Sequence, residues 1–215
     1  MTRIAHFTGD SVTDAERRTS EDGLGDGYVR VLSRRPELQG WSIENSGVSG
    51  NRTSDLQARW DADVLDHAPD VLSILVGVND MWRRYDNDDP TDAAVFEERY
   101  RALLTAAVAA SVSESTAGST AGSGTHALHF VLVEPFLLPV RPEQETWLED
   151  LDPKREVVKR LADEFSAAFV PLHVELTRLA ASVGPATLAD DGVHPTPAGH
   201  EALADIWLAH ASLPV

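Results

Sequence analysis

The chain has 215 residues, of which 42% are hydrophobic and 25% are charged, a composition typical of one globular domain with a sizeable core. Its 35 Asp and Glu residues against 18 Lys and Arg residues give a formal charge of −17, which repels nucleic-acid phosphates and anionic lipid headgroups. We therefore expect neither a nucleic-acid nor a membrane partner. The absence of cysteine excludes disulfides, thiol nucleophiles and thiolate metal sites.

The N-terminus runs almost directly into a polar motif, which leaves no room for the charged start and apolar stretch of a secretory signal. No segment approaches the roughly 20 apolar residues of a membrane helix. We therefore expect a cytoplasmic protein with a single domain spanning residues 1–215.

Short apolar runs alternate with longer amphipathic segments, which is the pattern of a parallel sheet covered by helices. The run at 71–76 is typical of a central strand that is buried on both faces. Thr196 and Pro197 have the composition of a helix N-cap and first turn. In chain order, the sequence predicts strand 3–7, helix 27–34, strand 41–45, helix 54–66, strand 71–76, helix 93–112, strand 128–133, helix 153–168, strand 169–172 and helix 197–208.

The segment at about 113–125 is rich in Ser, Thr, Gly and Ala. Such a composition favours a mobile insertion loop between two elements, and we do not interpret it as a linker between domains.

Polar, glycine-rich segments follow the predicted strands. In open α/β sheets, ligands bind beyond the carboxyl ends of the strands, so these segments are the candidate site. Each of them has an ordinary explanation as a turn or a helix cap when taken alone. Together they hold four blocks in one chain, at 9–14, 45–51, 77–80 and 191–195.

These blocks contain every group that acyl transfer requires. A serine hydroxyl becomes a nucleophile when a neutral imidazole takes its proton, and the imidazolium then needs an ionised partner. We expect Ser11 as the nucleophile, His194 as its base and Asp191 as the residue that orients the base. The oxyanion donors are expected to be the N–H groups of Ser11 and Gly50 and the side-chain amide of Asn79.

The four blocks resemble those of the SGNH or GDSL-type hydrolases, a family named for one Ser, Gly, Asn and His in separate segments. The matching residues are Ser11, Gly50, Asn79 and His194, and the resemblance covers nearly the whole chain. It implies a three-layer α/β/α sandwich with a central, mainly parallel, flavodoxin-like sheet. It also implies a serine esterase acting on short-chain carboxylic esters through an acyl-enzyme, without a metal or other cofactor.

A closer likeness is to the acetylxylan-esterase-like branch of this family, and it rests on segments 25–29, 47–60, 79–86 and 134–136. Members of that branch remove acetyl groups from xylan fragments and often form oligomers. The resemblance therefore implies an O-acetylated xylo-oligosaccharide substrate and a homo-oligomer. Two residues depart from the pattern, because Val12 stands where Leu is usual and Asp190 stands where some relatives have an aromatic residue.

Several further residues are candidates for substrate binding. Trp82 and Tyr85 are expected to form an aromatic wall for a sugar ring, with Arg83 or Arg84 bonding its hydroxyl groups and Asp10 beside the nucleophile. Asp14 and Asp80 are interpreted as supports of the loops. The remaining histidines show no metal-ligand spacing and are interpreted as structural; they are His6, His67, His126, His129, His173, His200 and His210.

Other functions fit parts of the pattern. A general short-chain lipase or thioesterase would use the same residues. A flavin-binding protein could hold phosphate on the segment 7–13, although Asp191 and His194 would then have no role. A non-catalytic carbohydrate-binding module and a metal-dependent phosphoesterase with Asp10, Asp191 and His194 as ligands also remain open.

Overall fold

The computed structural model describes residues 2–117 and 128–214. Within these residues, five parallel strands form one sheet in the order β2-β1-β3-β4-β5. The strands are β1 (Ile4–Gly9), β2 (Ser42–Asn45), β3 (Val71–Leu75), β4 (His129–Val133) and β5 (Ala168–Val170). The predicted α/β fold is confirmed, and β3 is the central strand, as its apolar sequence indicated.

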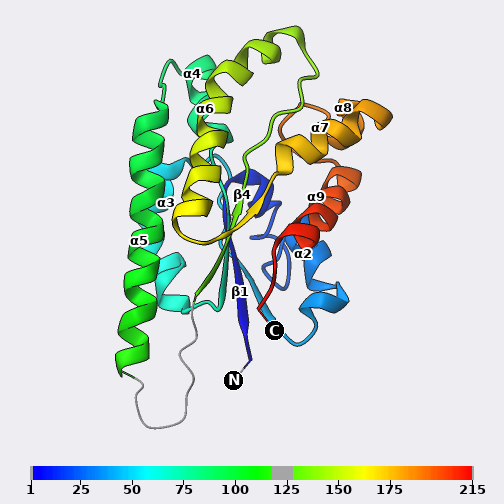
Figure 1. Cartoon of the computed structure of the whole chain (residues 1–215). Coiled ribbons are helices and arrows are strands. Elements are labelled where there is room, and N and C mark those ends of the chain that lie inside the picture. The colour runs from blue at the N-terminus through cyan, green and yellow to red at the C-terminus, as the bar shows by residue number, and fades with distance from the viewer. Residues whose placement is uncertain (1, 118–127, 215) are drawn as a thin grey trace.

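Helices cover both faces of the sheet. Figure 1 shows α3, α5 and α6 on one face and α2, α7 and α9 on the other, which makes three layers. The helices in the described residues are α1 (Ser11–Asp14), α2 (Tyr28–Ser33), α3 (Thr53–Asp63), α4 (Val78–Asp86), α5 (Ala93–Ala117), α6 (Pro142–Glu164), α7 (Leu172–Val183), α8 (Pro185–Leu188) and α9 (Pro197–His210), with 3₁₀ turns η1 (Pro36–Leu38) and η2 (Leu65–His67). Among these helices, none has the length and apolar content needed to span a membrane.

Alternation along the strands divides the core into two clusters. Phe7 of β1 and Val131 of β4 pack on the face of α2, α7 and α9, whereas Leu72 and Ile74 of β3 pack under α3, α5 and α6. Successive side chains of a strand point to opposite faces, so β3 and β4 each supply both clusters. This explains why the central strands are apolar over most of their length instead of alternating with polar residues.

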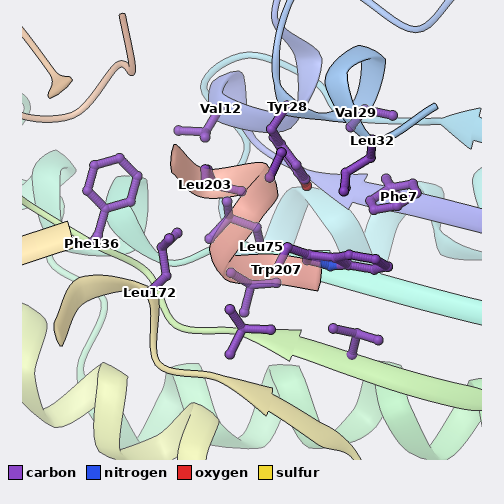
Figure 2. Packing of buried hydrophobic residues seen from close by; sticks show 14 of the residues in the cluster. Phe7, Val12, Tyr28, Val29, Leu32, Leu75, Phe136, Leu172, Leu203 and Trp207 are labelled. Atoms are coloured by element: carbon purple, nitrogen blue, oxygen red, sulfur yellow. The ribbon is translucent and has the colours of Figure 1, made fainter. Parts of the chain in front are cut away.

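Trp207 of α9 anchors the first of these clusters. Its ring is fully buried and lies 5.2 Å from the ring of Phe7, centroid to centroid. Its indole N–H donates to the hydroxyl of Ser73 on β3 at 2.9 Å, so the one polar atom of the ring is satisfied. Figure 2 shows Trp207 in one cluster with Phe7, Leu75 and Leu203.

The predicted start of the helix at Pro153 is wrong. Helix α6 begins at Pro142 and passes through Pro153, although proline lacks an N–H and disfavours a helix interior by roughly 3 kcal/mol. The apolar residues on both sides of the proline are buried in the core, with Leu151 before it and Val157 and Leu161 after it. This packing outweighs the local preference of proline.

Four helices of the described residues were not predicted, and two of these, α1 and α8, have only four residues each. The segment after β3, expected as a loop, forms α4, and Leu172, expected to end a strand, begins α7. Asn, Asp and Gly favour turns in isolation, but Val78 and Met81 of α4 are buried against α6 residues. Helix α5 continues through Ala117, past its expected end, and the rest of the expected insertion loop lies outside the described residues.

The cap of the last helix is as predicted. The side-chain oxygen of Thr196 accepts a hydrogen bond from the N–H of Gly199 at 3.1 Å, and Pro197 occupies the first turn of α9. The same hydroxyl donates to the carbonyl of Thr187 at 2.6 Å. The cap therefore also ties α9 to α8.

We expect Trp207→Ala to lower the free energy of unfolding by about 3–5 kcal/mol, because it leaves a cavity against Phe7 and the sheet. Ser73→Ala removes only the hydrogen-bond partner of the indole and is expected to cost about 1–3 kcal/mol. Urea denaturation followed by circular dichroism measures both values. Equal losses in the two variants would contradict a role of Trp207 in packing.

Candidate active site

Ser11 lies at the carboxyl end of β1, where the strand turns into the short helix α1. The side chain of Asp10 caps this helix by accepting the N–H of Val12 at 3.1 Å. Gly9 has a φ of +155°, and a Cβ there would lie 2.0 Å from the carbonyl oxygen of Leu75 on β3. Only glycine allows this close approach of the two strand ends, which presents Ser11 at the edge of the sheet.

A chain of hydrogen bonds links Ser11, His194 and Asp191. The Oγ of Ser11 lies 2.9 Å from Nε2 of His194, and Nδ1 of His194 lies 2.6 Å from Oδ2 of Asp191. The other carboxylate oxygen of Asp191 accepts the N–H groups of Val193 at 2.8 Å and of His194 at 2.7 Å. The three predicted residues are therefore brought together in the order that the chemistry requires.

The loop that carries Asp191 and His194 is held by Gln144 of α6, which the sequence did not single out. Its fully buried amide donates from Nε2 to the Asp191 carbonyl at 2.6 Å, and its oxygen accepts the N–H groups of Val140 and Arg141. Residue 192 in this loop is glycine, and a Cβ at this position would lie 2.7 Å from the carbonyl oxygen of Leu138. A larger residue would therefore disturb the loop. A lone Gln at the start of a helix gives no sequence signal for such a role.

Opposing effects set the protonation of the Asp191 and His194 pair. Burial alone raises the pKa of Asp191, but hydrogen bonds from the His194 side chain and from the N–H groups of His194 and Val193 outweigh it and leave the pKa below its ordinary value. The hydrogen bond to Asp191 in turn raises the pKa of His194 above its ordinary value of 6.5, against the effect of burial. Asp191 is thus ionised at neutral pH and stabilises the protonated imidazole.

Asp10 lies below the surface, with 1% of its area exposed. Burial raises its pKa to about 7, partly opposed by the N–H of Val12 and by the charge of His194. Its side chain caps α1, so this arrangement does not support the sequence-based expectation that Asp10 binds substrate. The carboxylate contributes instead to the field around His194, whose pKa it raises.

The loop after β2 packs against the end of β1 and against α1. Val48 donates its N–H to the Gly9 carbonyl at 3.1 Å, and Ser49 donates its N–H to Oδ2 of Asp14 at 2.8 Å. Gly47 lies so close to α1 that a Cβ would be 2.3 Å from the nitrogen of Asp14. These contacts place Gly50, which is exposed and has a φ of +81°, beside the turn that carries Ser11.

Asn79 is in the first turn of α4, not in a loop, and is 3% exposed. Its Nδ2 donates to the carbonyl of Asn51 at 3.1 Å, and its Oδ1 accepts a hydrogen bond from Arg83 at 3.1 Å. Asp80 accepts both the N–H and the hydroxyl of Thr53, at 3.0 and 2.6 Å, and burial raises its pKa to about 6. Residues of α4 are therefore bonded directly to the segment that follows Gly50.

Arg59 of α3 holds the same region in place, and it was not singled out from the sequence. Its guanidinium donates to the carbonyl of Ser46 at 2.7 Å, to the carbonyl of Gly9 at 3.2 Å and to Oδ1 of Asn51 at 2.7 Å. One side chain thus joins β1 to both ends of the loop that contains Gly50. An Arg on a helix face is ordinarily solvated, so the sequence held no sign of this role.

The aromatic side chains of α4, Trp82 and Tyr85, both contact Trp147 of α6, with the Trp82 ring 6.0 Å from that of Trp147, but they differ in their contact with His194. The ring of Trp82 lies 6.1 Å from the ring of His194, centroid to centroid. The ring of Tyr85 stacks at 5.0 Å on Trp147 of α6 and has no ring contact with His194 among the contacts described. Arg83 is engaged with Asp86 and Asn79, and Arg84 lies 3.6 Å from Asp150. Of the expected sugar-binding residues, only Trp82 has a described contact with His194.

The ligand atoms of Asp10, Asp191 and His194 do not form a group close enough to hold a metal ion. Among the described residues, such a group is found only at His6, Glu44 and His67, away from Ser11. This geometry does not support the alternative of a metal-dependent phosphoesterase at the predicted site.

A sequence model of the GDSL-like lipase/acylhydrolase family matches residues 7–202, a span that contains Ser11, Gly50, Asn79 and His194. The chain belongs to this family. It is a carboxylic ester hydrolase, as the residues of the four blocks and the family resemblance predicted, and the non-catalytic flavin-binding and carbohydrate-binding alternatives are therefore wrong. The family also accounts for the α/β fold with its parallel sheet.

Relatives of known structure within the family include acetylxylan esterases. The chain is 35% identical over 212 residues to an acetylxylan esterase of Geobacillus stearothermophilus, covering 94% of this chain and 90% of that protein. The crystal structure of Axe2, an acetylxylan esterase from the same organism, superimposes with a TM-score of 0.79 at 32% identity over 99% of this chain and 95% of that one. A variant of Axe2, described as an acetyl-xylooligosaccharide esterase, matches equally well, with a TM-score of 0.79 at 32% identity and the same coverage.

We expect the pKa of His194 to lie above 6.5 and to fall when Asp191 is replaced by Asn, because the imidazolium loses its anionic partner. NMR titration of the imidazole ring measures both values. Asp190→Asn is the matched control, since Asp190 raises the pKa of His194 only through its charge and should lower it less. A pKa that stays constant in Asp191→Asn would contradict the assigned electrostatics.

Proposed function

We propose that this chain is a serine esterase that removes acetyl groups from O-acetylated sugars, such as xylo-oligosaccharides, through an acyl-enzyme on Ser11. The observation that carries the proposal is the continuous hydrogen-bonded chain from Ser11 Oγ through His194 to Asp191, at 2.9 and 2.6 Å. A nucleophile, its base and an orienting carboxylate in this order are what acyl transfer requires. Axe2 structures that carry alanine in place of a serine, an aspartate or a histidine are described as catalytic mutants, which supports the same roles here.

In the first step, Oγ of Ser11 attacks the ester carbonyl carbon while Nε2 of His194 takes the hydroxyl proton. The ionised Asp191 stabilises the imidazolium through its bond to Nδ1. The tetrahedral intermediate then collapses, the bond to the sugar oxygen breaks, and His194 returns its proton to that oxygen. The sugar leaves as an alcohol, and the acetyl group remains on Ser11.

In the second step, water attacks the acetyl-enzyme. His194 takes a proton from the water and returns it to Oγ of Ser11 as the acetate leaves. The elevated pKa of His194 favours its protonated form, so the rate is expected to rise with pH as the imidazole becomes neutral.

Three donors are assigned to the oxyanion: the N–H of Ser11, the N–H of Gly50 and the side-chain amide of Asn79. The support is that the loop of Gly50 is bonded to Gly9 and Asp14, and that Asn79 is bonded to Asn51, next to Gly50. A Cβ at Gly50 would meet no atom within 4 Å, so there is open space in front of this residue for an ester group.

The substrate class rests on Trp82 and on the relatives. A large aromatic face beside the catalytic histidine suits a sugar ring, whose C–H groups pack on aromatic rings. The matched Geobacillus proteins are an acetylxylan esterase and an acetyl-xylooligosaccharide esterase. The alternative is a general short-chain lipase or thioesterase, which would use the same three catalytic residues but would not depend on Trp82 for a sugar.

We expect Ser11→Ala to abolish hydrolysis of p-nitrophenyl acetate and of acetylated xylo-oligosaccharides, because no nucleophile remains. The parent enzyme should have a higher kcat/KM for acetyl than for butyryl and longer esters. Release of nitrophenol and of acetate measures these rates. Residual turnover in a well-folded Ser11→Ala protein would overturn the assigned nucleophile, and a preference for long acyl chains would favour the lipase or thioesterase alternative.

The same substrates tested on Trp82→Ala separate sugar recognition from chemistry. This variant should raise KM for the acetylated oligosaccharide more than for p-nitrophenyl acetate. Tyr85→Ala is the matched control, because the Tyr85 ring stacks on Trp147. Parallel losses on both substrates would argue against a sugar-binding role of Trp82.

We expect Asn79→Ala to lower kcat by roughly 10²–10³ with little change in KM, because an oxyanion donor acts mainly in the transition state. Steady-state kinetics on p-nitrophenyl acetate measures the effect. Arg83→Ala is a useful control, since it removes the bond to Oδ1 of Asn79 but keeps the donating amide. An unchanged kcat in Asn79→Ala would remove this residue from the oxyanion site.

A further inference from the structure

Three potential metal ligands converge beside β2, an edge strand of the sheet. His6 of β1 and Glu44 of β2 are register partners, so their side chains lie next to each other on the same face. This is the face of α3, and His67 in η2, just after α3, reaches the same point. We refer to His6, Glu44 and His67 as the edge-strand cluster.

Both imidazoles direct the same atom at the same carboxylate oxygen. Nδ1 of His6 lies 3.1 Å from Oε2 of Glu44, and Nδ1 of His67 lies 2.7 Å from that oxygen. The three ligand atoms all lie within 4.8 Å of one another.

The separations are close to those of a coordinated ion. Metal bonds of about 2.0–2.2 Å to nitrogen and oxygen put neighbouring ligand atoms of a tetrahedral site about 3.4 Å apart. The observed 3.1 and 2.7 Å need an expansion of less than about 1 Å. His6 is held at 1% exposure, whereas the Glu44 and His67 side chains are 29% and 43% exposed and have room to adjust.

A hydroxyl group orients the buried ligand. The second ring nitrogen of His6, Nε2, lies 2.7 Å from Oγ of Ser46, which is itself 3.5 Å from the carbonyl oxygen of Phe7. With the hydroxyl donating to that carbonyl, Oγ accepts the Nε2–H of His6 and leaves the Nδ1 lone pair free for a metal. Metal-bound histidines ordinarily have such a partner on their other nitrogen.

The cluster lines an open cavity of about 310 Å³, which gives an ion access and leaves space for water ligands. Asp22 and Asp63 add carboxylates to the wall of this cavity, and Arg17 adds one cation. The guanidinium of Arg17 is held by the carbonyl of Gly47 through Nε. Asp22 is paired with Arg30 and Asp63 with Arg59, whereas the ion pairs of Glu44 among the described residues are with His6 and His67, so Glu44 is the carboxylate available to an ion.

We propose that His6, Glu44 and His67 bind one divalent transition-metal ion of the Zn²⁺ class, with water completing the coordination. Two imidazoles and one carboxylate favour Zn²⁺ and its neighbours over Mg²⁺ and Ca²⁺, which prefer oxygen ligands. His6 lies within β1, and Ser11 follows five positions later, beyond the end of that strand, which is an extended span of roughly 15 Å. The cluster is therefore separate from the hydrogen-bonded chain of Ser11, His194 and Asp191. The ion stabilises the junction of β1, β2 and η2.

The test uses the full chain, stripped with a chelator and titrated with ZnCl₂ by calorimetry. We expect one Zn²⁺ per chain and a rise in Tm on binding, because the ion binds the folded state. His67→Ala and Glu44→Gln should each weaken binding at least roughly tenfold. Both residues are partly exposed, so these variants keep the fold that a substitution of the buried His6 could disturb.

Two controls locate the ion. His210→Ala removes a histidine outside the cluster and should bind Zn²⁺ as the parent does. His194→Ala should also bind normally, which separates this site from any ion held by Asp191 and His194. Three results would overturn the proposal: loss of binding in His194→Ala, unchanged binding in both cluster variants, or no binding by the parent protein. The three residues would then be joined by hydrogen bonds and would not form a metal site.

Discussion

The hydrogen bond between Ser11 and His194 joins residues 183 positions apart, and the site depends on this one contact. It forms because β1 delivers Ser11 to the carboxyl edge of the sheet while the loop before α9 delivers His194 to the same edge. Neither residue could reach the other by local structure. The geometry of this contact therefore depends on the packing that holds both segments in place. Part of that packing is Trp207 of α9, which contacts Phe7 of β1 and Ser73 of β3.

Buried polar side chains connect the packed core to the loops of the site through hydrogen bonds. Asp10, Asp80 and Gln144 are almost inaccessible, and each is bonded to backbone groups at or next to the site. Burial raises the pKa of both carboxyls, so their hydrogen bonds are formed at a cost in desolvation that only a well-ordered site offsets. Arg59 plays the same part for the loop of Gly50.

Sequence reasoning succeeded where residue type and spacing carry the signal and failed where packing overrides them. The strands and the cap at Thr196 follow from apolar patterning and capping chemistry, and all were predicted closely. Helix α6 was predicted to begin at Pro153, but the buried residues on both sides of the proline keep the helix continuous from Pro142 to Glu164. Asn79 was placed in a loop, since its neighbours have turn propensity.

The amino-acid sequence by itself determined the family, because Ser11, Gly50, Asn79 and His194 follow one another in that order within the residues that the family model matches. Only the tertiary structure decided which side chains meet. Trp82 and Tyr85 both contact Trp147, but of the two only Trp82 has a described ring contact with His194. His6 meets His67 although no ligand spacing links them in sequence. The physical reason is that strand register and helix docking set these distances, and neither is encoded in local residue spacing.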